Sequence, residues 1–317
     1  MAVRVKEKIF RDDDPMPKSM RKGKNVFCYV MISLAVFHFL VFYLYVNFDS
    51  ILLAFKEFVG MENGKEVYRW SLGNFTRLWR DITGPRSVIG EALGNTALFF
   101  SLNVVLIPLC FFISYFLYKK LWGYRFFKVV FFLPSIISSV VLVTMYKNFL
   151  AADGPLSTII QACGGESLPS LLTNDKTAKW VIFAYCAWTG FGVNVVLYQG
   201  AMSRIPDSVI EAGILDGVGA GREMFSIILP MMWPTLSTTI ILMFTGVFLA
   251  SGPNLLFIPI DGDQFGTMTI SYWIFHSVSA SSYEYPSAVG LVFTCLGLPI
   301  VFGARAIMNR LFEDVEY

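Results

Sequence analysis

The residues whose types and spacing point to a function lie in one polar segment, 203–230, between two long apolar stretches. Pro206 suits the first turn of a helix. Ser208 and Glu211 have the three-residue spacing of a capping box, and an acidic side chain near a helix N-terminus is favourable. This segment therefore predicts a helix that begins near residue 206.

The same segment also shows how that helix should pack and end. One apolar residue recurs every four positions, which predicts a single apolar stripe: Ile210, Ile214 and Val218. Asp216-Gly217 predicts the end of the helix, because Gly adopts the left-handed conformation that commonly follows a helix. We expect a short surface helix, a sharp turn and a second rise into the next apolar stretch.

Catalytic and nucleotide-binding motifs are absent from the sequence. No GxxxxGK[ST] loop occurs to hold nucleotide phosphates, and no HExxH motif occurs to hold zinc. The cysteines show no CxxC spacing, and we interpret them as small buried hydrophobic residues: Cys28, Cys110, Cys163, Cys186 and Cys295. We therefore predict no catalytic group, no metal site and no cofactor bound by this chain. Any energy for its activity must come from a partner.

The composition assigns the chain to the membrane. Of its 317 residues, 55% are hydrophobic and only 15% are charged, whereas a soluble domain carries about 25% charged residues. The net charge of +2, without a long Lys/Arg run, excludes nucleic acid as a partner class. The polar segment 1–24 has no apolar core, so it is not a signal peptide.

Six stretches are long and apolar enough to cross a bilayer, which takes about 20 helical residues. They are 26–48, 92–118, 129–146, 180–202, 227–251 and 286–304. Segment 264–283 also lacks charged residues of the Asp, Glu, Lys and Arg types, but it is rich in Ser and Thr, and we interpret it as interfacial or re-entrant. The sequence predicts an all-α membrane protein with about six transmembrane helices.

The basic residues give an orientation. Eight Lys or Arg residues precede the first span, four lie between spans two and three, and none lies between spans five and six. Because basic residues concentrate in short cytoplasmic flanks, both termini and segment 203–226 are predicted to be cytoplasmic. The loop 49–91 has six basic residues, but it is long and also acidic, so it carries less weight.

Segment 203–230 resembles the EAA signature of the permease subunits of ATP-binding-cassette (ABC) importers. That signature is Glu-Ala-Ala, three residues, Gly, nine residues, Ile, one residue and Leu-Pro. The matching positions, together with the aspartate before the second glycine, are Glu211, Ala212, Gly213, Asp216, Gly217, Ile227, Leu229 and Pro230. The single departure, Gly213 in place of Ala, should loosen the helix by up to about 1 kcal/mol without changing its docking shape.

Other motifs are similar to the maltose-type sugar permease branch of this family. They are Asn95-Thr96, Asp153-Gly-Pro-Leu, Gly190-Phe-Gly-Val-Asn194 and Tyr283-Glu-Tyr-Pro-Ser-Ala288. The likeness covers about two thirds of the chain, 95–310, and it is closest to permeases for oligosaccharides or complex sugars. It implies the type I ABC importer permease fold and a bacterial inner-membrane location. The domains expected are a tail 1–25, a first helix with an extracytoplasmic segment 26–90, a core 91–306 and a tail 307–317.

The resemblance also implies a mechanism and a set of partners. The short helix would dock on a cytoplasmic ATPase, with Glu211 near the contact, and ATP and Mg²⁺ would be bound by that ATPase. The remaining partners would be a second permease subunit, a second ATPase subunit, an extracytoplasmic solute-binding protein and membrane lipid. A heterodimer of permeases is favoured, and a homodimer stays open. The alternative is that segment 203–226 is only an amphipathic connector.

Polar and aromatic residues in the fourth and fifth spans are candidates for the substrate path. They are Asn194, Tyr198, Gln199, Phe248, Ser251 and Asn254. The alternative is that they pack helices together, as small and polar residues commonly do in membranes. The second half of span five lacks the amide residues frequent in maltose-type permeases. Either the partner permease holds the sugar or the pair binds it weakly.

Three further function classes are the alternatives. An ABC permease for a non-sugar solute would share the EAA signature. An ion-coupled secondary transporter usually places an ionisable residue inside a span, and the six predicted spans have none apart from His38. If the chain were a membrane scaffold without transport activity, the similarity of segment 203–230 to the EAA signature would be unexplained.

Overall fold

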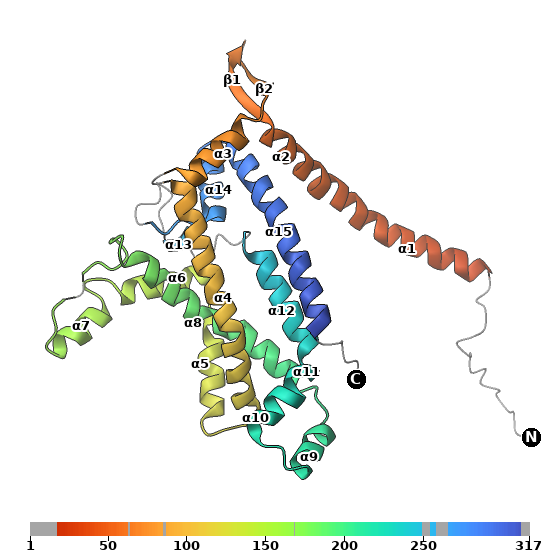
Figure 1. Ribbon diagram of the computed structural model, residues 1–317, viewed down its shortest axis with the longest axis vertical. Coiled ribbons are helices and arrows are strands. Elements are labelled where there is room, and N and C mark those ends of the chain that lie inside the picture. The colour runs from red at the N-terminus through yellow and green to blue at the C-terminus, as the bar shows by residue number, and fades with distance from the viewer. Residues whose placement is uncertain are drawn as a thin grey trace, which may run out of the picture. The chain divides into compact units, whose positions relative to one another are not determined.

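A computed structural model describes residues 18–62, 64–84, 87–167, 169–248, 254–257 and 266–311 of the chain (Figure 1). The chain divides into two compact units between Leu53 and Ala54. The first is a continuous helical run of α1 (Lys18–His38), the π-helical η1 (Phe39–Tyr45) and α2 (Val46–Ala54). Its side chains from residue 26 to residue 51 are exposed. A helix that is apolar all round suits lipid, and it is long enough to span a membrane from Val26 to Ala54.

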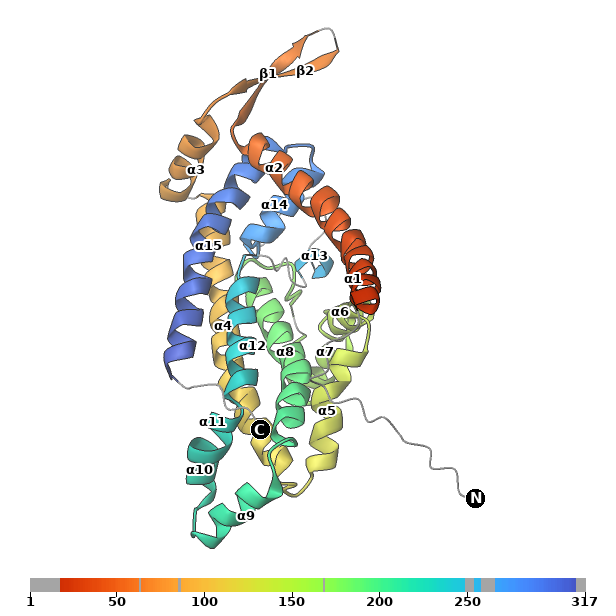
Figure 2. The ribbon, with the colours of Figure 1, turned by 90° about the vertical axis from the view of Figure 1, so that its right-hand side faces the viewer.

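Three long helices of the second unit are also able to span a membrane. They are α4 (Val88–Tyr118), α8 (Ala178–Met202) and α15 (Glu284–Leu311). Helices α4 and α8 pack along each other, and Ser114 Oγ donates a hydrogen bond to the Val195 carbonyl over 3.2 Å (Figure 2). A Cβ at Gly190 would lie 2.8 Å from Leu106 Cδ1, so the missing side chain allows this close approach.

The predicted third span is bent in the structure. The chain forms α5 (Tyr124–Ile136) and α6 (Ser139–Phe149), which meet at an angle of 108°. Pro134 in the last turn of α5 removes a backbone donor, and Ile137 is extended with φ −77° and ψ 139°. The helix therefore breaks just after the proline that this stretch carries.

The predicted fifth span is bent as well. It consists of α10 (Ala220–Glu223), the π-helical η2 (Met224–Ile228), α11 (Leu229–Met231) and α12 (Trp233–Gly246). The part up to Met231 makes an angle of 72° with α12, which has Pro234 in its first turn. The described residues thus contain four continuous spans, or six if each bent pair is one span. The all-α membrane fold with about six spans is confirmed.

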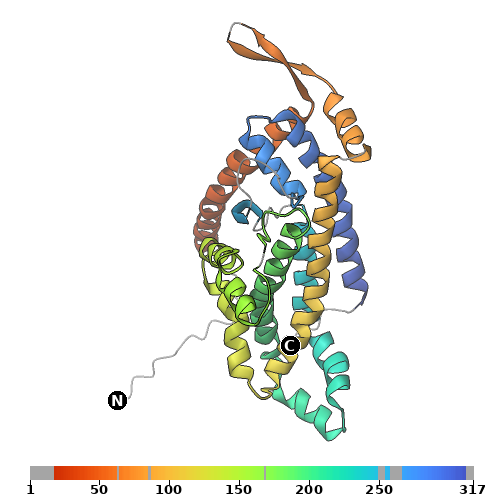
Figure 3. The ribbon, with the colours of Figure 1, turned by 90° about the vertical axis from the view of Figure 1, so that its left-hand side faces the viewer.

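The segment between α2 and α4 contains an element that the sequence did not predict. Strands β1 (Lys56–Glu62) and β2 (Lys65–Trp70) form an antiparallel hairpin that pairs Lys56 with Trp70, with an irregularity between Phe58 and Gly60. Helix α3 (Gly73–Thr83) follows. The hairpin lies at the end of the second unit opposite helix α9 (Asp207–Leu215), as Figure 3 shows.

Three short helices complete the second unit: α7 (Pro155–Ala162), α13 (Asn254–Phe257) and α14 (Ile270–Ser279). Helix α14 has 10 residues, about 15 Å at 1.5 Å per residue, which is too short to span a bilayer. It lies in segment 264–283, whose first two residues are outside the described part. Asn95 Nδ2 donates to the carbonyls of Gly266 and Met268, each over 2.9 Å, and so fixes the chain ahead of α14.

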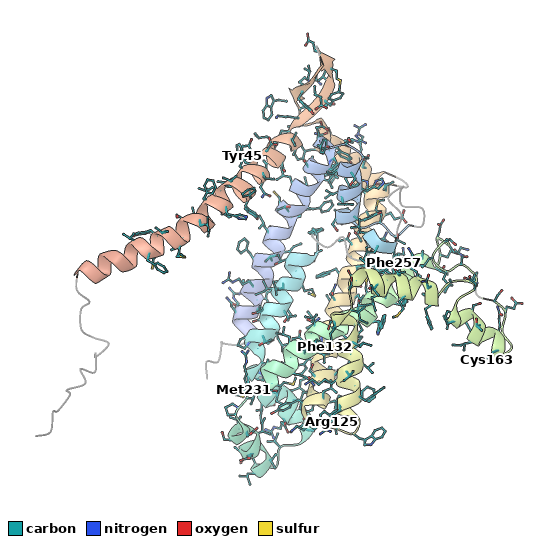
Figure 4. All side chains as sticks on the ribbon, turned by 180° about the vertical axis from the view of Figure 1, so that it is seen from behind. Tyr45, Arg125, Phe132, Cys163, Met231 and Phe257 are labelled. Carbon is teal, nitrogen blue, oxygen red and sulfur yellow. The ribbon has the colours of Figure 1, made fainter. Side chains whose placement is uncertain are left out.

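The main buried core lies at the α9 end and joins α4, α8, α9 and α12. It includes Cys110, which is fully buried, as predicted. Cys28, Cys163 and Cys295 are exposed, so the prediction of burial is wrong for them. Cys163 lies at the end of α7, and the other two are on spanning helices (Figure 4). The expected domain boundaries near residues 25, 90 and 306 stay predictions.

Candidate functional site

Segment 203–230 forms the predicted surface helix α9 (Asp207–Leu215), which lies beyond the ends of the long helices (Figures 1 and 2). Pro206 is the residue before the helix, not in its first turn, and the N-terminus has no side-chain cap. The predicted capping box of Ser208 and Glu211 is therefore wrong. An extended Pro206 already directs the chain into the helix, and Ser208 falls inside the first turn instead of before it.

The end of α9 follows the prediction. Gly217 has φ +72°, the left-handed conformation that a glycine adopts without strain. Its N–H donates to the Ile214 carbonyl over 3.0 Å, and the Val218 N–H donates to the Gly213 carbonyl over 2.9 Å. These two bonds form a Schellman motif, which satisfies the last carbonyls of the helix. The turn therefore has a defined geometry that directs the chain into α10.

The predicted apolar stripe of α9 is divided between two surfaces. Ile210 is buried in the main core, whereas Ile214 is 60% exposed and Leu215 is 87% exposed. The helix turns its Ile210–Gly213 edge toward the protein, so the next two apolar residues face outward. These two apolar side chains are therefore available for contact with a partner.

The EAA residues themselves separate into an outward and an inward group. Glu211, Ala212, Asp216 and Gly217 are exposed. In the described part of the chain, the Glu211 side chain has no hydrogen bond or ion pair. The outward group is therefore available to a partner.

The inward group holds α9 against the helix that follows. Gly213 is buried, and a Cβ at this position would lie 2.8 Å from Ile227 Cδ1. Ile227 belongs to η2, and Leu229 and Pro230 belong to α11; all three are half-buried. Gly213 and Ile227 therefore meet when the loop closes.

Sequence reasoning missed two polar contacts between this loop and the end of α4. Tyr115 Oη donates to the Ala220 carbonyl over 3.0 Å, and Lys119 Nζ lies 2.5 Å from Glu223 Oε1. Glu223 is 5% exposed. The only sequence signal for the burial of Glu223 was its position directly before an apolar run. Its partner Lys119 lies 104 positions earlier in the chain, and no local pattern indicates that pairing.

The predicted path residues on α8 have different surroundings. Tyr198 is fully buried in the main core, and Asn194 Nδ2 donates to the Gly190 carbonyl of its own helix over 3.3 Å. Gln199 lines a cavity of about 490 Å³ at the α9 end, together with Lys120 and Lys128. These residues therefore do not form one shared polar site on α8.

The other predicted path residues lie elsewhere. Phe248 contacts Phe293 of α15, with ring centroids 5.2 Å apart. Asn254 is 2% exposed and donates to the Thr267 carbonyl over 3.1 Å. Ser251 lies outside the described residues. The substrate path remains a prediction.

Comparison with known proteins identifies the family. The sequence pattern of the "Binding-protein-dependent transport system inner membrane component" family matches residues 106–316, which include α9 and the whole EAA signature. The chain belongs to this family. It is a multi-pass membrane protein and a transport component, as the sequence predicted.

Similar curated permeases extend the match beyond the family pattern. This permease is 26% identical to the lactose transport permease LacF of Rhizobium radiobacter over 288 residues, covering 86% of this chain and 91% of LacF. It is also 26% identical to the polygalacturonan/rhamnogalacturonan permease YteP of Bacillus subtilis over 319 residues, covering 98% and 96%. The arabinooligosaccharide permease AraP of the same organism is 24% identical over 274 residues, covering 85% and 84%.

Two solved structures share the fold of this permease. One is a bacterial ABC transporter that imports the acidic polysaccharide alginate, with a TM-score of 0.74, 18% identity and coverage of 93% of this chain and 99% of the other. The second is a bacterial alginate ABC transporter in complex with a periplasmic protein that holds an alginate pentasaccharide. It has a TM-score of 0.76, 18% identity and coverage of 96% and 100%. At this identity the likeness establishes the fold.

Proposed function

We propose that this permease forms the membrane path of an ATP-driven importer for a sugar or oligosaccharide, and that α9 connects it to a cytoplasmic ATPase. The observation that carries the proposal is the division of α9. Gly213 fixes the helix to the permease, while Ile214 and Leu215 are exposed beside the unpaired carboxylate of Glu211. One face of the helix packs against the permease, and the opposite face exposes apolar side chains to a partner. A displacement of the partner is therefore passed to the permease through the helix.

The ATPase supplies both the nucleotide chemistry and the movement. Two ATPase subunits bind ATP and Mg²⁺, close together and bring the paired α9 helices toward each other. Closure at this end turns the membrane helices as near-rigid bodies from an inward-open to an outward-open arrangement. Neither step requires a nucleotide site on the permease.

The proposed orientation places both termini and α9 in the cytoplasm. Basic residues support it, because Lys119, Lys120, Arg125 and Lys128 follow the second span within ten residues. Arg125 lies at the same end of the second unit as α9 (Figure 4). The hairpin of β1 and β2 is then extracytoplasmic.

The substrate class and the remaining partners follow from the relatives. LacF, YteP and AraP are named for lactose, polygalacturonan or rhamnogalacturonan, and arabinooligosaccharides. A saccharide delivered by an extracytoplasmic binding protein is therefore the proposed cargo. A second, different permease subunit completes the path.

The docking of α9 is tested with Glu211→Lys in the reconstituted importer. We expect the variant to insert into the membrane normally but to lose the stimulation of ATP hydrolysis by the binding protein, because it reverses an exposed charge in the contact. Glu166→Lys, an exposed acidic residue between α7 and α8, is the matched control and should keep the stimulation. Stimulated hydrolysis that persists in Glu211→Lys would contradict the docking role.

The cargo is tested on the binding protein. We expect oligosaccharides, but not amino acids or metal ions, to raise its thermal unfolding temperature, since a ligand that binds only the folded state stabilises it. A response to a non-sugar solute alone would favour the alternative permease class.

A further inference from the structure

Glu223, the last residue of α10, is a buried carboxylate beside apolar neighbours. Its Oε1 lies 2.5 Å from Nζ of Lys119, the residue that follows the last turn of α4. The Glu223 side chain is 6% exposed and that of Lys119 is 29% exposed. The pair therefore lies at the edge of the main core, with the carboxylate inside.

A second contact joins the same two elements. The hydroxyl of Tyr115, one turn before Lys119, donates to the carbonyl of Ala220, the first residue of α10. Tyr115 is 3% exposed, and Lys119 Nζ lies 6.0 Å from the centroid of its ring. Both ends of α10 are thus fixed to the last turn of α4.

The energetics of such a pair favour a positional role. Removing a carboxylate from water is costly, and a buried ion pair is often no more stabilising than well-packed apolar residues in its place. The other ion pairs among the described residues, Arg69–Glu57 and Arg77–Asp81, join exposed side chains of the hairpin and α3. What Lys119 and Glu223 add is a fixed position of α10 on α4.

Helix α10 lies in the chain between α9 and the bent fifth span, so its fixed position bears on how a movement of α9 is passed on. Only residues 216–219 separate it from α9, and the tight turn at Gly217 leaves little slack. On its other side lies the π-helical η2 and then the 72° bend into α12. π-Helical turns are frequent at functional sites. A displacement of α9 therefore reaches α10 directly, whereas α12 is joined through a bend.

We propose that Lys119 and Glu223 form a permanent link through which the α9–α10 segment moves α4, and that the pair stays closed through the whole transport cycle. The inference rests on the proposed docking of α9 on an ATPase. Helix α4 packs along α8, with the Ser114–Val195 hydrogen bond between them. A force that enters at α9 is thereby passed to the pair of long helices. Lys119 and Glu223 are positioning residues and touch no substrate.

Charge reversal tests the link in the complete reconstituted importer. Lys119→Glu and Glu223→Lys should each lower binding-protein-stimulated ATP hydrolysis by about tenfold or more, because each leaves a buried like-charge pair. The exchanged double variant should recover to within about threefold of the original chain. Lys120→Glu, the exposed neighbour, makes the same charge change and should have no effect. Single reversals that keep full stimulation, or a double variant without recovery, would overturn the inference.

A cross-link tests permanence and does not depend on the folding of the reversed variants. The five native cysteines are first replaced, and Lys119→Cys is combined with Glu223→Cys. Without the ion pair, stimulated hydrolysis should be impaired, and joining the thiols with a short bifunctional reagent should restore it. A cross-link that stops hydrolysis would show that the pair must open, and the inference would be wrong.

Co-purification of the ATPase separates this inference from the proposed function. All Lys119 and Glu223 variants should retain the ATPase, whereas Leu215→Asp on the exposed face of α9 should release it. If Leu215→Asp also retains the ATPase, the docking proposal is wrong. If the ATPase binds through α9 but the variants at residues 119 and 223 leave stimulated hydrolysis unchanged, only the proposed Lys119–Glu223 link is wrong.

Discussion

The segment between α8 and α12 and the segment between α2 and α4 both connect long helices, but different contacts hold them in place. The first is held by the buried Lys119–Glu223 pair and by Ile210 in the main core. The second is held by α3, where Asp81 Oδ2 accepts a hydrogen bond from Tyr285 Oη over 2.5 Å. Arg77 and Asp81 form an ion pair within α3, and their side chains are 60% and 39% exposed.

Solvent access distinguishes the ion pairs of these two connections. Exposed charges are screened by water and salt, so an ion pair on a surface fixes little. A buried carboxylate that loses its partner has no such compensation. The family pattern includes the first segment and begins after the second, at residue 106. Under the proposed function the first segment transmits force, whereas the second is held by its own local contacts.

Among the substitutions that follow, filling the contact between α9 and η2 should have the largest effect. Gly213→Val places side-chain atoms where a Cβ already lies 2.8 Å from Ile227 Cδ1. The end of the Ile227 side chain can move away from a single Cβ, but the two further methyl groups of Val overpack the contact at a cost of about 1–3 kcal/mol. We expect binding-protein-stimulated hydrolysis to fall by about tenfold, since a 1.4 kcal/mol change corresponds to a factor of ten.

A matched glycine provides the control for that variant. Gly221 of α10 has open space around the position of a Cβ, so Gly221→Ala should leave stimulated hydrolysis unchanged. Gly213→Val combined with Ile227→Ala should recover part of the loss. Full activity of Gly213→Val would show that the packing of α9 is not needed to transmit force.

The contact between α3 and α15 should affect stability but not coupling. Tyr285→Phe removes the donor to Asp81 and keeps the ring that packs against Trp273, 5.6 Å between centroids. We expect a loss of about 1 kcal/mol in the free energy of unfolding, at the low end for a bond to a charged group because Asp81 is partly exposed. Thermal unfolding in detergent measures it. Tyr283→Phe, at a 46% exposed position two residues earlier, is the control.

Stimulated hydrolysis in the same Tyr285→Phe sample sharpens the comparison. It should remain at the level of the original chain. A loss of coupling as large as that expected for Glu223→Lys would mean that the α3 contact also transmits force, and the distinction between the two segments would fail.

The smallest effect is expected on the hairpin. Arg69 and Glu57 form an ion pair of 3.5 Å between side chains that are 73% and 44% exposed. Arg69→Ala should change the free energy of unfolding by less than about 0.5 kcal/mol, because exposed pairs contribute little. A larger shift of the thermal midpoint would indicate that the hairpin packs against a surface not seen in the isolated chain.

Sequence reasoning succeeded where the determining interactions are local. The end of α9 was predictable because Gly217 acts through its own backbone, and the long apolar runs were predictable because a spanning helix forms all its backbone hydrogen bonds internally. The capping box failed because Pro206 had already set the start of the helix. The hairpin was missed because its strands alternate only weakly between polar and apolar residues.

Within segment 203–230, too, local interactions could be predicted from the sequence and tertiary contacts could not. The order of residues alone determined that a membrane protein would carry a short helix ending before Gly217, since period, turn chemistry and spacing act over a few positions. Only the tertiary structure decided that Ile210 faces inward while Ile214 and Leu215 face outward, that Gly213 meets Ile227, and that Glu223 meets Lys119. Those contacts depend on how α4, α9 and α10 pack, and packing joins residues that no local pattern relates.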